Sequence, residues 1–139
     1  MIRAVIDTNV LVSGLLTPSG NEALIVLAIH QGFLQPCWSD EILTEYAAVL
    51  ARSKFAFEPD EIDALLAMLR EKGELIQPTG PCPTLPDVDD GKFLHCAESS
   101  HAEYIVTGNK RHFPQELCGD IRVVNAGELL DRITLEIRP

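Results

Sequence analysis

The chain has 139 residues, 46% of them hydrophobic, so we expect one folded domain over residues 1–139 and not a disordered chain. Its 21 acidic and 11 basic side chains leave a net charge of −10, the wrong sign for binding phosphates through bulk electrostatics. Either the ligand is not a nucleic acid or divalent cations neutralise a clustered acidic site, unless the surplus of acid serves solubility alone.

The first half of the chain alternates predicted strands and helices. "IRAVID" (2–7) is a β-rich run that ends at an acid, and "FLQPCW" (33–38) is a short strand despite its proline. "GNEALIVLAIHQG" (20–32) is apolar on nearly every side and ends at glycine, which predicts a buried helix. "SDEILTEYAAVLAR" (39–52) begins with a Ser-Asp start signal and carries apolar residues at helical spacing, so it is the next predicted helix.

A further helix is predicted over "PDEIDALLAMLREKG" (59–73), which has proline in its first turn and glycine at its end. "ELIQP" (74–78) is a weak third strand, and the four prolines of "PTGPCPTLP" (78–86) predict a loop. "DDGKFLHCAESSHA" (89–102) predicts a helix, although glycine lies near its start.

The last predicted strands are "EYIVT" (103–107) and "IRVV" (121–124), and "AGELLDRI" (126–133) is a closing helix. Short strands that alternate with helices predict an α/β fold, with a parallel sheet covered by helices on both faces. Ligands of such a sheet bind beyond the carboxyl ends of the strands, near the point where the strand order reverses.

The longest purely apolar run, "ALIVLAI" (23–29), is too short to span a bilayer, and Asp7 interrupts the first apolar stretch. We therefore expect no transmembrane helix and no signal peptide. The four cysteines, at positions 37, 82, 96 and 118, are widely spaced. They predict reduced thiols in a cytoplasmic protein, and neither a disulfide framework nor a zinc site.

Asp7 comes directly after an apolar run, where a parallel sheet binds its ligands. The simpler interpretation is an N-cap for a helix that begins at "NVLVSGLL" (9–16). Successive residues of a helix are rotated by about 100° about its axis. On this basis Glu45 lies beside Val49, at the margin of the buried face of the predicted helix 39–52. A solvated helix glutamate is the alternative there.

Asp90 stands on the apolar stripe of its predicted helix, because apolar residues follow it at i+3, i+4 and i+7. An acid on a core face costs desolvation unless it has a partner. A capping box with Asp87 as the cap is the alternative, and Asp89 is the adjacent candidate for the site. Asn109 follows glycine after a predicted strand, where asparagine is frequent because it tolerates the left-handed conformation.

Taken together, Asp7, Asp90 and Asn109 lie at strand ends or at the following helix starts, and Glu45 can flank them. All four are oxygen ligands without a matching Cys or His set, so we expect a hard cation, Mg²⁺ or Mn²⁺. Such an ion activates a water and neutralises a phosphodiester in its transition state. A local basic rim could hold the phosphates beside it: Lys92, Lys110, Arg111 and His112.

Four segments resemble the motif blocks of the PIN-domain nucleases, in order and in spacing. They are "VIDTNVLVSGLL", "SDEILTEYAAVL", "DVDDGKFLHCA" and "AEYIVTGNKRHFP", which span residues 5–114, and residues 120–133 resemble the closing strand and helix. The similarity is to the bacterial and archaeal branch described as toxin components of toxin–antitoxin modules. It implies a three-layer α/β/α fold with a five-stranded parallel sheet, a Mg²⁺- or Mn²⁺-dependent ribonuclease, commonly a homodimer, and a small antitoxin that blocks the site.

By this resemblance Asp7, Glu45 and Asp90 match the first three family acids, which are catalytic and bind the metal. The fourth position is usually aspartate in "TGD" and is Asn109 here. An amide oxygen can ligate a hard cation but adds no charge, so we expect a weakened ligand. The implied supporting residues are Thr8, Thr107 and Asp89, and the implied substrate-binding residues are Lys92, Lys110 and Arg111.

The leading hypothesis is an endoribonuclease that hydrolyses RNA with a metal-activated water. A catalytically weak or silent PIN module that binds RNA or a protein partner is the alternative, suggested by Asn109 and the acidic surface. A phosphotransfer domain fits less well. A haloacid-dehalogenase-like phosphatase needs a second aspartate where Asn9 stands, and a receiver domain needs an acid pair where the chain has Asp7 alone.

Overall fold

Five parallel strands form a sheet in the order β3-β2-β1-β4-β5 in the computed structural model, which describes residues 1–138. The strands are β1 (Ile2–Ile6), β2 (Leu34–Trp38), β3 (Glu74–Leu75), β4 (Tyr104–Val106) and β5 (Arg122–Val124). Strand β1 is central: Ile2 pairs with Leu34 of β2 on one side, and Ile6 pairs with Val106 of β4 on the other. The predicted parallel sheet is confirmed.

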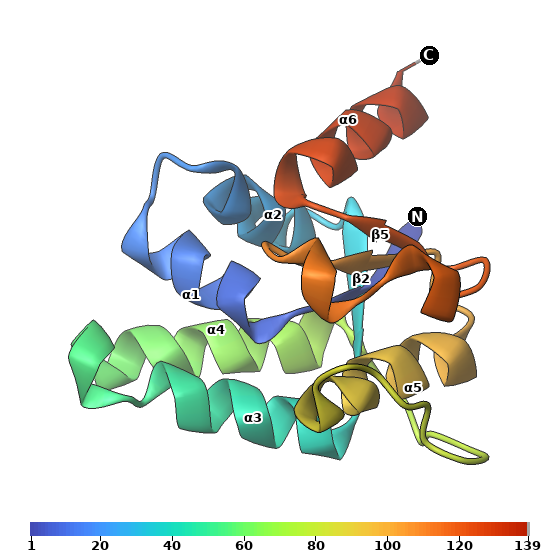
Figure 1. Cartoon of the computed structure of the whole chain (residues 1–139). Coiled ribbons are helices and arrows are strands. Elements are labelled where there is room, and N and C mark those ends of the chain that lie inside the picture. The colour runs from blue at the N-terminus through green and yellow to red at the C-terminus, as the bar shows by residue number, and fades with distance from the viewer. Residues whose placement is uncertain (139) are drawn as a thin grey trace.

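Helices cover both faces of this sheet (Figure 1). They are α1 (Thr8–Leu16), α2 (Asn21–His30), α3 (Asp40–Leu50), α4 (Pro59–Lys72), α5 (Gly91–Ser100) and α6 (Ala126–Ile137). Helix α5 packs on β1, β2 and β4, and α3 lies beside it; α2 and α6 contact each other on the opposite side. The three-layer α/β/α arrangement is therefore as expected.

Most elements differ by one or two residues from their predicted limits, and three of them show the following differences. Strand β3 is an exposed edge strand of two residues, because its partner β2 ends at Trp38, which pairs with Leu75 and accepts the Ile76 N–H at 2.8 Å. Helix α5 starts at Gly91 after a 3₁₀ turn, Val88–Asp90, and ends at Ser100, because His101 adopts a left-handed conformation with φ 55°. Helix α6 extends beyond the predicted segment to Ile137.

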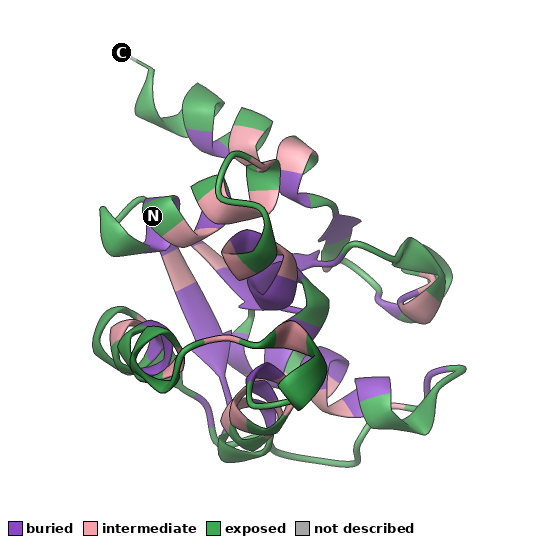
Figure 2. Ribbon diagram, turned by 90° about the vertical axis from the view of Figure 1, so that its left-hand side faces the viewer, coloured by how far each residue is buried: buried purple, intermediate pink, exposed green. Residues whose placement is uncertain are grey.

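The core lies between the sheet and the inner faces of the helices, where Figure 2 shows the buried residues. Among the largest fully buried side chains are Tyr46 of α3, Phe93 of α5 and Phe113. Within residues 1–138, no single helix is long and apolar enough to cross a membrane. Helices α1 and α2 reach that length and composition only as a pair, which is bent by 103°.

The strand order reverses at β1, because the chain goes from β1 to β2 on one side and later adds β4 on the other. The carboxyl ends of β1 and β4 lead directly into Asp7 and Thr107. A parallel sheet binds ligands at such a point. The fold therefore places these two residues where a site is expected.

Candidate metal centre and active site

Asp7 occupies the N-cap position of α1, but its side chain makes no capping hydrogen bond. Its Oδ2 accepts a hydrogen bond from Thr107 Oγ1 at 2.8 Å, and its backbone N–H donates to the Val106 carbonyl at 2.9 Å. Burial raises the pKa of Asp7, and the bonds from Thr107 and from the Thr8 amide partly offset the rise. The carboxylate is therefore held both by Thr107 after β4 and by the first amide of α1, without a regular capping bond.

Glu45 approaches the same end of the sheet from α3. Its Oε2 accepts a hydrogen bond from Thr8 Oγ1, and its Oε1 lies 2.6 Å from Lys92 Nζ. Lys92 Nζ also donates to the Asp89 carbonyl at 2.6 Å, and the lysine side chain is only 11% exposed. One carboxylate thus ties α1, α3 and α5 together through charge-assisted contacts.

Asp90 ends the 3₁₀ turn before α5 and is 8% exposed. In residues 1–138 no donor bonds to its buried Oδ2. His112 Nδ1 lies 2.9 Å from this oxygen, close enough for an ion pair but outside hydrogen-bond geometry. Burial raises the pKa of Asp90 to about 6; His112 opposes the rise, and the charges of Asp7 and Asp87 add to it. Asp90 is a desolvated carboxylate without a full set of partners.

Asp87 is the structural residue of this turn, since its Oδ1 accepts the Asp89 N–H at 2.9 Å. Asp90 makes no reciprocal capping bond, so the capping box that the spacing allows is not formed. Asp89 is exposed and takes part through its backbone, donating to Asp87 and accepting from Lys92. Its own carboxylate is therefore not needed to shape the turn.

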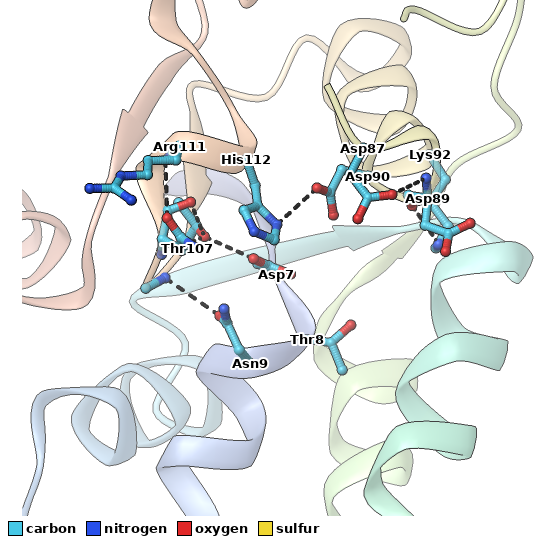
Figure 3. A network of polar contacts seen from close by, with 12 residues as sticks. Asp7, Thr8, Asn9, Asp87, Asp89, Asp90, Lys92, Thr107, Arg111 and His112 are labelled. Carbon is cyan, nitrogen blue, oxygen red and sulfur yellow. Dashed lines mark hydrogen bonds and ion pairs between the residues drawn. The ribbon is translucent and has the colours of Figure 1, made fainter. Parts of the chain in front are cut away.

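Asp7 lies close enough to Glu45 and to Asp90 for their charges to interact, and we call these three predicted ligands the acidic cluster (Figure 3 draws Asp7 and Asp90). The charge of Glu45 raises the pKa of Asp7, and the charge of Asp7 raises the pKa of Asp90. Clustered, partly buried carboxylates are costly until a cation compensates them. A divalent ion near Asp7 and Asp90 would compensate their charges, whereas Glu45 already has Lys92 as its partner.

Asn109 is exposed and caps the 3₁₀ turn Lys110–His112. Its Oδ1 accepts the Arg111 N–H at 3.2 Å, and its own N–H donates to Thr107 Oγ1 at 3.0 Å. Its φ is −139°, so tolerance of the left-handed conformation does not explain this asparagine. The side chain has a local structural task, and its role as a metal ligand stays a prediction.

The residues of the predicted basic rim have separate surroundings. Lys92 is paired with Glu45, and Lys110 Nζ lies 2.6 Å from Glu128 Oε1 of α6. Arg111 is exposed and extends away from the acids (Figure 3). Lys92 and Lys110 are thus each paired with a glutamate, and Arg111 extends toward solvent.

Two polar residues near Asp7 have partners that the sequence did not predict. Tyr46, one of the residues at helical spacing in the predicted helix 39–52, donates its buried hydroxyl to the carbonyl of Ile6. Asn9 Oδ1 accepts the Gly108 N–H at 3.4 Å and so joins α1 to the loop after β4. A buried tyrosine needs a hydrogen-bond partner, and that rule was the available signal for Tyr46. Both contacts fix the backbone on either side of Asp7.

An apolar groove of about 810 Å³ lies elsewhere, between α1, α2 and α4. Its lining includes Leu15, Val26, Leu65 and Met68, and it includes none of the predicted site residues. The acidic cluster therefore belongs to the carboxyl edge of the sheet and not to this groove.

Comparison with known proteins supports the resemblance noted in the sequence. The profile of the PIN domain matches residues 3–111. Over 112 residues the chain is 30% identical to an uncharacterized protein of Methanocaldococcus jannaschii, an alignment that covers 78% of this chain and 72% of that protein.

Two solved structures have a similar fold. One is VapBC2 from Rickettsia felis, bound to a DNA fragment from its promoter, with a TM-score of 0.61 and 14% sequence identity. The alignment covers 89% of this chain and 98% of that chain. For FitAB bound to a DNA fragment, the TM-score is 0.56 at 16% identity, covering 88% and 94%. At these identities the likeness confirms the α/β fold alone.

Proposed function

The chain belongs to the PIN-domain family, and from this premise we propose that it is a divalent-metal-dependent endoribonuclease that hydrolyses RNA phosphodiesters. The observation that supports the proposal most directly is the acidic cluster of Asp7, Glu45 and Asp90 at the point where the strand order reverses.

The donor set suits Mg²⁺ or Mn²⁺, because carboxylate oxygens are the ligands that such ions prefer. Asp90 Oδ2 is the clearest sign of a fit: it is buried and has no hydrogen-bond donor among the residues described. Asp7 and Asp90 would hold the ion, with Glu45 and Asn109 beside them. When bound, a divalent cation lowers the pKa of a water and neutralises charge on the phosphate.

The surrounding residues would keep the carboxylates in place for this chemistry. Thr107 directs Asp7 through its 2.8 Å hydrogen bond, and Thr8 and Lys92 hold the two oxygens of Glu45. The exposed Arg111 is free to contact an RNA phosphate. The ion and this arginine would make the local potential at the substrate more positive, although the whole chain has a net charge of −10.

The test is cleavage of single-stranded RNA with Mn²⁺, with Mg²⁺ and with EDTA. We expect Asp7→Asn and Asp90→Asn to abolish cleavage while the circular dichroism spectrum is retained. Asp63→Asn, an exposed aspartate of α4, is the matched control and should cleave like the wild type. Full cleavage by the Asp7 or Asp90 variant, or by the wild type in EDTA, would reject the proposal.

A silent PIN module that binds RNA or a protein partner is the second candidate. It is favoured by Asn109, a neutral residue whose Oδ1 is already bonded to the Arg111 amide. RNA binding that persists in EDTA, without turnover in any metal, would support this candidate over the nuclease.

We further propose that the chain is the cytoplasmic toxin of a toxin–antitoxin module, a homodimer inhibited by a small antitoxin. The support is the family resemblance and the fold shared with VapBC2 and FitAB. Expression of the chain alone should stop bacterial growth, and expression of Asp7→Asn should not. Light scattering should give twice the mass of one 15.3 kDa chain; equal growth of both strains would contradict the toxin role.

A further inference from the structure

Asp87, Asp90 and His112 form a group that differs from the predicted set of ligands (Figure 3). One candidate ligand atom from each lies within 4.8 Å of the other two. Two donors that share one first-row ion at about 2.1 Å stand roughly 3 to 4.2 Å apart. The three side chains therefore need only small adjustments to bind the same ion.

Asp90 gives an independent indication that a ligand belongs here. Its Oδ2 is buried, lacks a hydrogen-bond donor within residues 1–138, and faces His112 Nδ1 at 2.9 Å. A buried carboxylate oxygen without a donor is costly, and a cation placed between it and the imidazole would remove that cost. Asp87 is exposed at the outer edge of the group, where it can complete the set.

His112 is held toward α5 by its neighbours in the chain. Phe113 is fully buried and packs edge-to-face on Phe93 of α5, with ring centroids 6.2 Å apart and an interplanar angle of 85°. On the other side, the His112 N–H donates to the Asn109 carbonyl at 3.2 Å and closes the turn that Asn109 caps. The imidazole thus faces the first turn of α5 because the segment carrying it is anchored there.

We propose that His112 is a nitrogen ligand of the metal ion that Asp90 holds, with Asp87 as a further ligand, and that the site consequently selects Mn²⁺ over Mg²⁺. Mg²⁺ takes oxygen ligands and retains its waters, whereas imidazole suits first-row transition ions. A histidine donor also replaces the ligand strength that the neutral Asn109 lacks. The role of this ion in catalysis rests on the proposed function, but its binding does not.

Electron paramagnetic resonance of the full chain with Mn²⁺ tests the assignment directly. A nitrogen ligand couples its ¹⁴N nucleus to the Mn²⁺ spin, so the wild type should show ¹⁴N modulation of the electron spin echo. His112→Gln should abolish the modulation and weaken Mn²⁺ binding by about tenfold or more, with a clearly smaller effect on Mg²⁺. Asp87→Asn should weaken Mn²⁺ binding and keep the modulation.

His30→Gln is the matched control, since His30 is an exposed histidine at the end of α2. It should leave both the modulation and the Mn²⁺ affinity unchanged. Absence of ¹⁴N modulation in the wild type, or its persistence in His112→Gln, would overturn the assignment and leave His112 as an ion-pair partner of Asp90. Equal losses of Mn²⁺ and Mg²⁺ affinity would overturn the selectivity.

RNA cleavage by the same samples separates this inference from the proposed function. Modulation that depends on His112 in a protein that cuts no RNA would support the metal site and reject the nuclease. Cleavage that depends on Asp7 and Asp90, without ¹⁴N modulation, would support the nuclease and reject the histidine ligand.

Discussion

Lys92 Nζ of α5 lies 2.6 Å from Glu45 Oε1 of α3, and a second pair of the same length joins Lys110 to Glu128. The two pairs differ in exposure. The Lys92 side chain is 11% exposed and its partner 28%, whereas Lys110 and Glu128 are 50% and 47% exposed. The chain therefore contains a matched comparison between a partly buried ion pair and a solvated one.

Lys92→Met should destabilise the metal-free protein by about 2 kcal/mol, because Glu45 would lose its cation in a partly buried position. Lys110→Met should cost no more than about 0.5 kcal/mol, since its pair is screened by solvent. Urea unfolding in EDTA measures both values. Equal costs for the two variants would show that the Lys92–Glu45 contact contributes nothing specific.

Asp90→Asn should stabilise the metal-free protein near pH 7.5. The pKa of Asp90 is raised from 3.8 to about 6, so the folded state binds this proton more tightly than the unfolded state. The resulting contribution to the free energy of unfolding is fully present below about pH 4. This stabilisation is lost as the pH rises through about 6. Its size is roughly 3 kcal/mol at most, because the pKa values of the folded and unfolded states differ by about two units.

Thermal unfolding in EDTA between pH 4 and pH 8 tests whether stability falls as the pH rises. The wild type should lose stability over that interval, and Asp90→Asn should lose less, with the remaining slope coming in part from Asp7, whose pKa is also raised. Asp63→Asn controls for the removal of one negative charge. A steeper loss in Asp90→Asn than in the wild type would show that the buried carboxylate is already compensated in the metal-free protein.

Thr107→Val removes the hydroxyl that donates to Asp7 Oδ2 while it keeps the volume of the fully buried side chain. We expect a loss of about 1–2 kcal/mol in stability and a loss of about tenfold or more in Mn²⁺ affinity, because the carboxylate would no longer be oriented. Calorimetric titration and urea unfolding give the two values. Thr134→Val, which removes an exposed hydroxyl bonded to the Leu130 carbonyl, is the control and should change neither.

Most of the sheet could be predicted, because buried parallel strands such as 2–6 and 104–106 are mostly apolar, with Arg3 as the exception, and clear helix signals separate them. Strand β3 was predicted too long, since a short exposed edge strand carries little pattern. Asp7 and Asp90 were predicted as candidates from their places at a strand end and a helix start. Those places follow from local pattern and from the general form of a parallel sheet.

The partners of these residues could not be predicted in the same way. The pairing of Lys92 with Glu45 depends on how α5 packs beside α3, and the position of His112 depends on the contact of Phe113 with Phe93. Both are distances between segments far apart in the chain, and no spacing within one segment encodes them. Lys92 was therefore expected at the substrate, whereas the structure pairs it with an acid of the cluster.

Asn109→Asp tests whether the missing charge at this position matters to the metal. Aspartate can keep the cap, because a carboxylate accepts the Arg111 N–H as the amide Oδ1 does now at 3.2 Å. We expect Mn²⁺ affinity to rise in calorimetric titration, since the variant adds a negative charge to a residue bonded to Thr107, which also holds Asp7. Asn109→Ala is the matched control: it should lose about 1 kcal/mol of stability with the cap. If Asn109→Asp binds Mn²⁺ with unchanged affinity and stoichiometry while Asn109→Ala is destabilised, Asn109 is a turn residue only. In that case its contribution to the site is to close the turn that presents His112.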